Sequence, residues 1–311
     1  RWRGSRCCTT TSGAGKLCGS AASTWVRALK PPAEAASATI SNEGKGQPYA
    51  KNGPDGASGG RVSPYRLRAG VPRRRWLQDR CRILAGMKIC VLGLGYVGAV
   101  SAGCLAKDGH EVIGVDPERT KVDLINAGKT PIIEKDIGEI IHEQVAAGRL
   151  RATTEVGDAV RHTDVAFVCV GTPSQPNGGI DLTYIKRVCQ QIGETIATHP
   201  VAPVTVMRST MLPGTMRDVV IPILEKFSGK KAGEEFGLCI NPEFLRESTA
   251  VHDYYHPPKT VIGEVNRPSG DRLAAIYAKT PGPMIRTDLH PAEMVKYPDN
   301  CWHGLKVGFA N

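Results

Sequence analysis

The chain has 311 residues, 41% of them hydrophobic, which is enough for one or two domains with a buried core. Its formal net charge of +10 comes entirely from residues 1–86, which hold 16 basic and 4 acidic side chains, against 24 and 26 in the rest. The body after residue 86 is therefore nearly neutral and gives no reason to expect a nucleic-acid partner. No apolar run reaches the ~18 residues of a membrane span, so we expect no such span.

Residues 1–86 are rich in Gly, Ser and Ala and show neither helical nor strand periodicity. We predict a disordered basic extension over this range. Its Arg-rich, acid-poor composition could belong to an organelle transit peptide. We favour the alternative that it is a translated upstream sequence or an artificial remnant, with Met87 as the natural start.

From Met87 onward, short β-branched runs alternate with amphipathic stretches. Strands are predicted over residues 88–92, 111–115, 165–170, 204–208, 236–240 and 260–263. Helices are predicted between most of them, over residues 97–108, 119–126, 137–147, 182–197 and 215–227. This alternation indicates an α/β fold with a Rossmann-like, doubly wound parallel sheet covered by helices on both faces.

A last helix is predicted over residues 292–310, where the chain ends with nothing for the helix to pack on. Its end indicates that further protein is missing. Pro298 lacks an N–H and clashes with the preceding turn, so we expect a kink near Tyr297.

Six cysteines lie after residue 86, without a CxxC pair or a secretory signal. Several fall within apolar runs. We interpret them as buried thiols of a protein in the reducing cytoplasm, rather than as disulfides or metal ligands, and predict no metal site.

The first strand leads into a GxGxxG turn that opens a helix. Gly93 permits the tight turn, Gly95 lets the backbone approach a pyrophosphate, and Gly98 lets helix and strand pack closely. Asp116 ends the second strand 18 residues after Gly98, near the spacing of the carboxylate that takes the adenosine ribose hydroxyls. An acid there repels a 2′-phosphate, which favours NAD over NADP. An ordinary turn with Asp116 as a helix cap would not explain why turn, strand, helix and acid coincide.

Six ordered segments resemble the UDP-glucose/GDP-mannose dehydrogenase family, and the resemblance runs from residue 87 to residue 311. They are GLGYVG at 93–98, VGTPS at 170–174, RSTMLPGT at 208–215, NPEFLRES at 241–248, PPKTVIG at 257–263 and AEMVKY at 292–297, followed by Asn300. The resemblance implies a cofactor site for NAD formed by Tyr96, Val97, Asp116, Lys121, Thr172 and Thr210.

The same resemblance implies a set of substrate-handling residues. Glu247 is expected to contact substrate and assist catalysis, Glu243 to shape the site, and Lys296 with Asn300 to stabilise a developing alkoxide. His303 and Asn311 are expected to bind the sugar nucleotide.

Two of these assignments depend on local structure. Glu243 and Glu247 would share one helical face if residues 244–248 were helical, and like charges there would favour proton handling. The hydroxyl of Thr210 could hold a water or a cofactor oxygen during catalysis, or could simply cap the turn at residues 209–213.

The family oxidises the C6 alcohol of a nucleotide sugar to a carboxylate in two NAD-dependent steps, the second through a cysteine thioester. The wording of the motifs resembles members that make GDP-mannuronate for alginate more than those that oxidise UDP-glucose. A GGSC segment, which carries the family's catalytic cysteine, is absent from the 311 residues.

We therefore expect a truncated chain. The NAD-binding domain should cover residues 87–287, and residues 288–311 should begin a central dimerisation or linker helix of a homodimer or larger assembly. Cys301 would point about 140° away from Lys296 around a helix and is interpreted as structural. A non-catalytic NAD-binding module and a UDP-glucose dehydrogenase remain the alternative interpretations.

Overall fold

The computed structural model describes residues 86–310. The predicted extension over residues 1–86 therefore lies almost wholly outside the described residues, as does Asn311. Within the described part, no helix is both long enough and apolar enough to cross a membrane.

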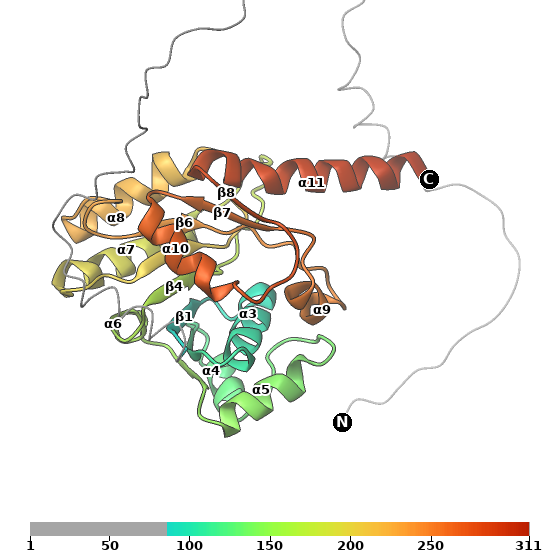
Figure 1. The fold of residues 1–311 in the computed structure, drawn as a ribbon, viewed down its shortest axis with the longest axis horizontal. Coiled ribbons are helices and arrows are strands. Elements are labelled where there is room, and N and C mark those ends of the chain that lie inside the picture. Colours follow the sequence, from blue (N-terminus) through green and yellow to red (C-terminus); the bar gives the residue numbers. More distant parts are fainter. Residues whose placement is uncertain (1–85, 311) are drawn as a thin grey trace, which may run out of the picture. The chain divides into compact units, whose positions relative to one another are not determined.

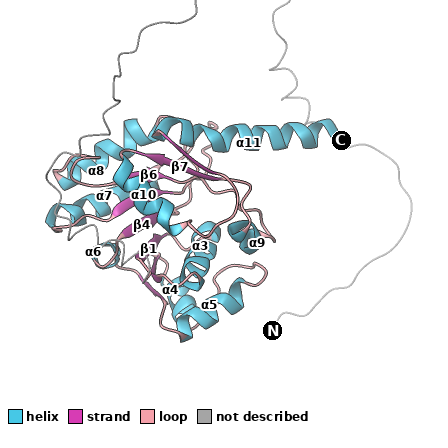
Figure 2. Cartoon of the chain, in the orientation of Figure 1, coloured by secondary structure: helices cyan, strands magenta, loops and turns pink. Residues whose placement is uncertain are grey.

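A single eight-stranded sheet forms the centre of the described residues (Figures 1 and 2). Its spatial order is β3-β2-β1-β4-β5-β6-β7-β8. The strands are β1 (Lys88–Leu92), β2 (Glu111–Val115), β3 (Leu150–Thr153), β4 (Val165–Val168), β5 (Val204–Met207), β6 (Leu238–Ile240), β7 (Thr260–Glu264) and β8 (Met284–Thr287). The strands β1 to β3 extend the sheet to one side, and the strands from β4 onward extend it to the other. The boundary between β1 and β4 is therefore the switch point at which such sheets bind ligands.

Helices cover both faces of this sheet. One face carries α3 (Tyr96–Lys107), α4 (Arg119–Asn126), α5 (Ile137–Ala146), α9 (Ala250–Tyr255) and α10 (Arg267–Ile276). The other carries α6 (Val156–Arg161), α7 (Thr183–Thr198), the π-helical turn η2 (Met216–Val220), α8 (Ile221–Ser228) and the start of α11 (Leu289–Ala310). In β1, β2 and β4 to β7, neighbouring residues enter opposite cores, so the predicted two-sided burial is confirmed for these central strands. The edge strands β3 and β8 contain exposed residues.

The predicted Rossmann-like parallel sheet is confirmed, with one antiparallel pair that was not foreseen: β7 runs antiparallel to β6. The connection between them contains only the short helix α9 and does not cross back over the sheet. Since a parallel neighbour requires a crossover connection, β7 starts at the edge where β6 ends and runs back. This reversal brings Lys259 beside the residues that follow β6.

The weakest sequence signals produced the other differences. The prediction omitted the strands β3 and β8 and the helices α6, α9 and α10. The helices α6 and α9 span only six residues each, and Pro268 opens α10. The helix predicted over residues 215–227 is divided into η2 and α8 where Pro222 has no N–H to donate.

The long helix α11 continues through Pro298 without interruption, whereas we expected a kink (Figure 1). Only its first turns pack on the sheet, with Ala292 and Glu293 buried, and every residue from Cys301 to Ala310 is exposed.

Candidate functional site

The glycine turn after β1 has the geometry that close approach of a phosphate requires. Gly93 has a φ of 98° and donates its N–H to Val115 O at 2.7 Å. A Cβ on Gly98 would lie 1.7 Å from Gly93 O, whereas a Cβ on Gly95 would meet no heavy atom within 4 Å. The third glycine is thus needed for packing, and the second leaves the turn open at the start of α3.

Asp116 is buried at the end of β2, with 5% of its surface exposed. Its two oxygens accept N–H groups from Leu94 at 2.8 Å and from Glu118 at 3.0 Å, which fixes the carboxylate beside the turn. Lys121 lies 3.6 Å away from it and 3.1 Å from Glu118. A carboxylate has about four acceptor positions, so Asp116 can still accept the two hydroxyls of a ribose.

Burial lowers the pKa of Lys121, but its contacts with Glu118 and Asp116 outweigh that effect and leave the pKa raised. The side chain therefore stays charged at neutral pH. A fixed cation beside a buried carboxylate suits the phosphate and ribose of a dinucleotide.

The turns after β4 and β5 are joined at the same edge of the sheet. Thr172 donates its hydroxyl to Thr210 O at 2.9 Å, and Ser209 donates to Val170 O at 2.6 Å. Within residues 86–310 no hydrogen bond is found for the Thr210 hydroxyl, so the capping role is not what the side chain does here. Its half-buried hydroxyl is free to contact a ligand.

Lys296 reaches this edge from α11. Its ammonium donates to Glu243 O at 2.6 Å and to the Glu243 carboxylate at 2.9 Å, and it lies 5.5 Å from the centre of the Phe244 ring. Both charged side chains are largely buried, with 14% and 11% of their surfaces exposed. A small cavity lined by Lys296 and Thr210 places these two residues together.

The expected pair of glutamates on one helical face is wrong. Residues 241–246 are irregular and residues 247–249 form a turn, because Asn241-Pro242 follows a strand end and Ser248 adopts a left-handed φ of 71°. Glu243 consequently pairs with Lys296, while Glu247 is exposed.

Asn300 and His303 are also exposed, one and two helical turns beyond Lys296. Among the described residues, neither forms a hydrogen bond or ion pair with Lys296 or Glu243. Asn311, the other expected substrate residue, lies outside the described residues.

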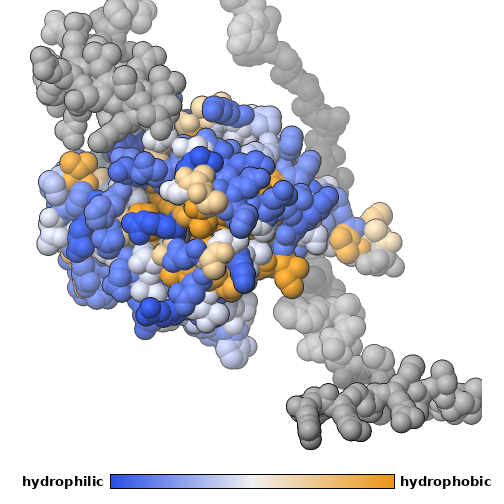
Figure 3. Space-filling model, turned by 90° about the horizontal axis from the view of Figure 1, so that it is seen from below, coloured by the Kyte–Doolittle hydropathy of each residue, from blue (hydrophilic) through white to orange (hydrophobic). Residues whose placement is uncertain are grey.

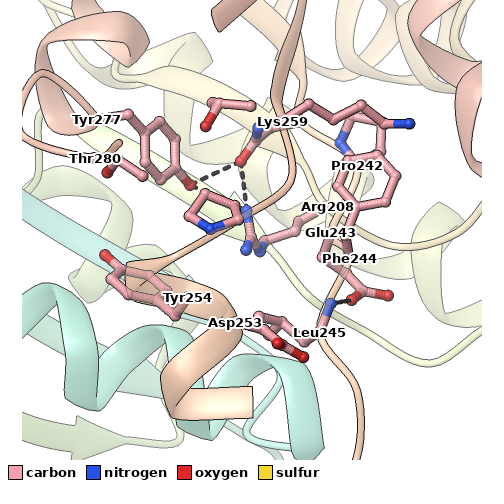
Figure 4. A pocket seen from close by; sticks show the side chains of 13 residues that line it. Arg208, Pro242, Glu243, Phe244, Leu245, Asp253, Tyr254, Lys259, Tyr277 and Thr280 are labelled. Carbon is pink, nitrogen blue, oxygen red and sulfur yellow. Dashed lines mark hydrogen bonds between the residues drawn. The ribbon is translucent and has the colours of Figure 1, made fainter. Parts of the chain in front are cut away.

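Sequence reasoning missed a buried polar cluster below the loop that follows β6 (Figure 4). The guanidinium of Arg208 donates to Asn241 and, at 3.0 Å, to the hydroxyl of Tyr277, which in turn donates to Asn241 at 2.7 Å. These side chains line a cavity of about 30 Å³ that also contacts Glu243 and Phe244. The cluster fixes the backbone that carries Glu243. The only sign of it in the sequence was an Arg directly after an apolar strand.

Two further contacts hold α11 to this edge, one an ion pair and the other a pair of hydrogen bonds. Lys259 lies 2.6 Å from Asp299, and its ammonium also lies 5.0 Å from the centre of the Phe244 ring. Glu293 is 2% exposed and accepts N–H groups from Gly214 at 2.8 Å and Met216 at 2.7 Å. Asp299 thus has a structural partner, although its position is one at which the sequence differs from the family motif.

Five of the six described cysteines are buried, as predicted, but Cys301 is exposed on α11. Burial raises the pKa to about 12 in Cys90, Cys104, Cys169, Cys189 and Cys239. The expectation that Cys301 is buried is therefore wrong, because no described residue packs over α11 at this position.

A glycine turn at the switch point of a largely parallel sheet, with a buried carboxylate ending the second strand, defines a dinucleotide-binding protein of the Rossmann class. Comparison with known proteins identifies the family. The NAD-binding domain of the UDP-glucose/GDP-mannose dehydrogenase family matches residues 87–281, and the chain belongs to this family. Its cofactor is NAD.

Individual relatives agree with this assignment. The chain is 56% identical to GDP-mannose 6-dehydrogenase of Azotobacter vinelandii over 225 residues, 72% of this chain and 52% of that one. A UDP-glucose 6-dehydrogenase of Haloferax volcanii is 39% identical over 72% of this chain and 53% of its own length. The crystal structure of a ternary complex of GDP-mannose dehydrogenase from Pseudomonas aeruginosa has a TM-score of 0.72 at 54% identity, covering 72% of this chain and 52% of that one. The chain thus spans about half the length of these relatives.

Proposed function

We propose that the protein oxidises the C6 alcohol of a nucleotide sugar with NAD, and that its substrate is GDP-mannose, converted to GDP-mannuronate for an alginate-type polysaccharide. The observation that carries this proposal is the Lys296–Glu243 pair, which stands beside Thr210 at the sheet edge that also carries the glycine turn. The higher identity to GDP-mannose dehydrogenases than to a UDP-glucose dehydrogenase supports the choice of substrate.

The chain's own residues suit an alcohol oxidation in the following way. NAD, when bound, supplies the hydride acceptor. The largely buried ammonium of Lys296 faces a region of low dielectric, where it stabilises negative charge on the substrate oxygen as the alcohol loses its proton. Glu243 holds that ammonium in place, Asn300 and Thr210 orient the same oxygen or a water, and Glu247 contacts the substrate.

Activity with purified full-length protein tests this proposal. GDP-mannose and UDP-glucose are each offered with NAD, and NADH is followed by absorbance. We expect turnover with GDP-mannose and a loss of kcat on the order of 10²–10³-fold in Lys296→Met, which removes the charge at the reacting oxygen. Lys306→Met, on the exposed end of the same helix, is the matched control and should leave kcat unchanged.

The two alternatives predict different outcomes in this assay. Faster turnover of UDP-glucose would identify a UDP-glucose dehydrogenase. NAD binding without NADH formation from either sugar would favour a non-catalytic NAD-binding module.

We further propose the domain limits expected above: an NAD-binding domain over residues 87–287, a connecting helix from residue 288, and a separable extension over residues 1–86. A homodimer or larger assembly and a cytoplasmic location complete the proposal; the five buried free thiols fit a reducing compartment. A chain that starts at Met87 should keep its melting temperature and NAD affinity, and a large loss of either would contradict the domain limits.

A further inference from the structure

We infer that Glu134 is a positioning residue that couples the cofactor turn to the loop carrying Glu247, so that NAD binding and the order of this loop are linked. The inference rests on the proposed function, because that function gives Glu247 its role. Glu134 lies in the connection between α4 and α5, far in sequence from both segments it joins.

The carboxylate of Glu134 accepts three hydrogen bonds from two directions. From the cofactor side, Tyr96, the first residue of α3, donates its hydroxyl to Glu134. From the loop, the N–H of Ser248 donates at 2.8 Å and that of Ala250 at 3.2 Å. Burial and this contact with Glu134 raise the pKa of Tyr96 well above its usual range, so the hydroxyl keeps its proton at neutral pH.

These contacts hold the residues before and after Glu247 in the sequence. The Tyr96 hydroxyl also lies 3.2 Å from Arg246 O, the residue before Glu247, and Glu134 holds the N–H of Ser248, the residue after it. Ser248 has a left-handed φ of 71°, a conformation that is unfavourable for a residue with a Cβ. Holding its N–H in this conformation fixes the direction in which Glu247 leaves the loop.

Tyr96 follows Gly95 directly, so its backbone belongs to the turn expected to receive the pyrophosphate. A ligand that fixes this turn also fixes the phenol ring, and through Glu134 it restrains residues 246–250. Coupling between two sites is reciprocal. If NAD favours the ordered loop by a given factor, the ordered loop must strengthen NAD binding by the same factor.

An acceptor-only group is required at position 134, because all three partners are donors. Glutamine keeps the shape but brings an N–H₂ group against one of them. We therefore expect a graded effect, intermediate in Glu134→Gln and complete in Glu134→Ala. Glu139→Gln, the same chemical change at an exposed position on α5, is the matched control.

Cleavage by trypsin after the exposed Arg246 measures the order of the loop without requiring turnover. In the full chain, we expect saturating NAD to slow this cleavage at least 5-fold. Glu134→Gln and Tyr96→Phe should be cleaved faster and lose most of the protection by NAD, with NAD binding itself still detectable by titration. Hydrogen exchange at Ser248 and Ala250 should accelerate in Glu134→Gln even without NAD.

The outcomes separate this inference from the proposed function. Normal exchange and normal NAD-dependent protection in both variants would overturn the coupling, whatever the enzyme does. If Glu134→Gln lowers the melting temperature strongly, Tyr96→Phe, which leaves Glu134 bound to the loop, decides the matter. In the active enzyme, Glu134→Gln should lower kcat and, because the coupling is reciprocal, also weaken NAD binding; an unchanged kcat would contradict the positioning of Glu247.

Discussion

Asp253 shows at the scale of single residues how the loop after β6 is held in an irregular conformation. Its buried carboxylate accepts hydrogen bonds from the Arg246 backbone at 3.0 Å, from the Arg246 guanidinium at 2.7 Å and 3.0 Å, and from the Thr249 hydroxyl at 3.1 Å. These contacts, with the Arg246 side chain as the largest cause, lower the pKa of Asp253 to about 2. The loop therefore depends on a charged Asp253.

Replacing Asp253 with Asn should destabilise the fold at neutral pH by about 2 kcal/mol, since hydrogen bonds to a charged group are lost. A carboxyl whose pKa is lowered on folding contributes stability above its unfolded pKa of about 4 and loses it as pH falls. The difference between wild type and Asp253→Asn should thus be full at pH 7 and shrink from about pH 4 toward pH 2. Urea unfolding across this range measures it, and a difference that does not change with pH would contradict the account.

Individual site residues were predictable only where a motif fixes the backbone. The glycines and Asp116 have the geometry expected of them because turn, strand and helix are local. The partner of Glu243 was not predictable, because Lys296 approaches it from a helix 53 positions later in the sequence. Glu134 had no signal at all, since its three partners come from two distant segments.

At the scale of elements, α11 is tied to the sheet by Glu293 rather than by apolar burial alone. The carboxylate accepts the N–H groups of Gly214 and Met216, just where η2 begins. Glu293→Gln keeps the volume but sets an N–H₂ group against one of these donors. We expect it to lower the free energy of unfolding by roughly 1–3 kcal/mol.

Melting curves of the two proteins measure this effect. His290→Ala is the control, because His290 lies 3.7 Å from the same carboxylate but is largely exposed. It should change stability by less than about 0.5 kcal/mol. A Glu293→Gln protein as stable as wild type would show that α11 docks without this contact.

The free end of α11 makes a second prediction possible. Trp302, Leu305 and Phe309 are exposed there, and apolar groups stand out at that end against a mostly hydrophilic face (Figure 3). Cys301 lies on the same segment. Iodoacetamide at pH 8 should therefore alkylate Cys301 at least 10-fold faster than the five buried cysteines, whose thiols rarely ionise.

Peptide mapping by mass spectrometry follows each cysteine separately. Equal rates in the native protein would contradict the described burial. Protection of Cys301 that disappears on dilution would show that another chain covers α11.

The order of elements followed from hydrophobic patterning, whereas their directions did not. Strong apolar strands and amphipathic helices were found within one or two residues of their bounds, for example β1 and α4. The reversal at β7 depends on a connection that stays at one edge of the sheet, and patterning within a strand carries no information on its direction.

At the scale of the whole molecule, the glycine turn, Asp116, Lys121 and the joined turns after β4 and β5 lie along one edge of one sheet. The family membership and this arrangement agree on NAD as the cofactor. We expect the repulsion between Asp116 and a 2′-phosphate to make NAD bind more tightly than NADP.

Titration of the protein with NAD and with NADP, followed by calorimetry, tests this central claim most directly. We predict that NAD binds at least about 10-fold more tightly, a difference of about 1.4 kcal/mol that a single charge repulsion can supply. Asp116→Asn, which keeps an acceptor but removes the charge, should weaken NAD binding and abolish most of the preference. Binding of NADP as tight as or tighter than NAD in the unaltered protein would contradict the account.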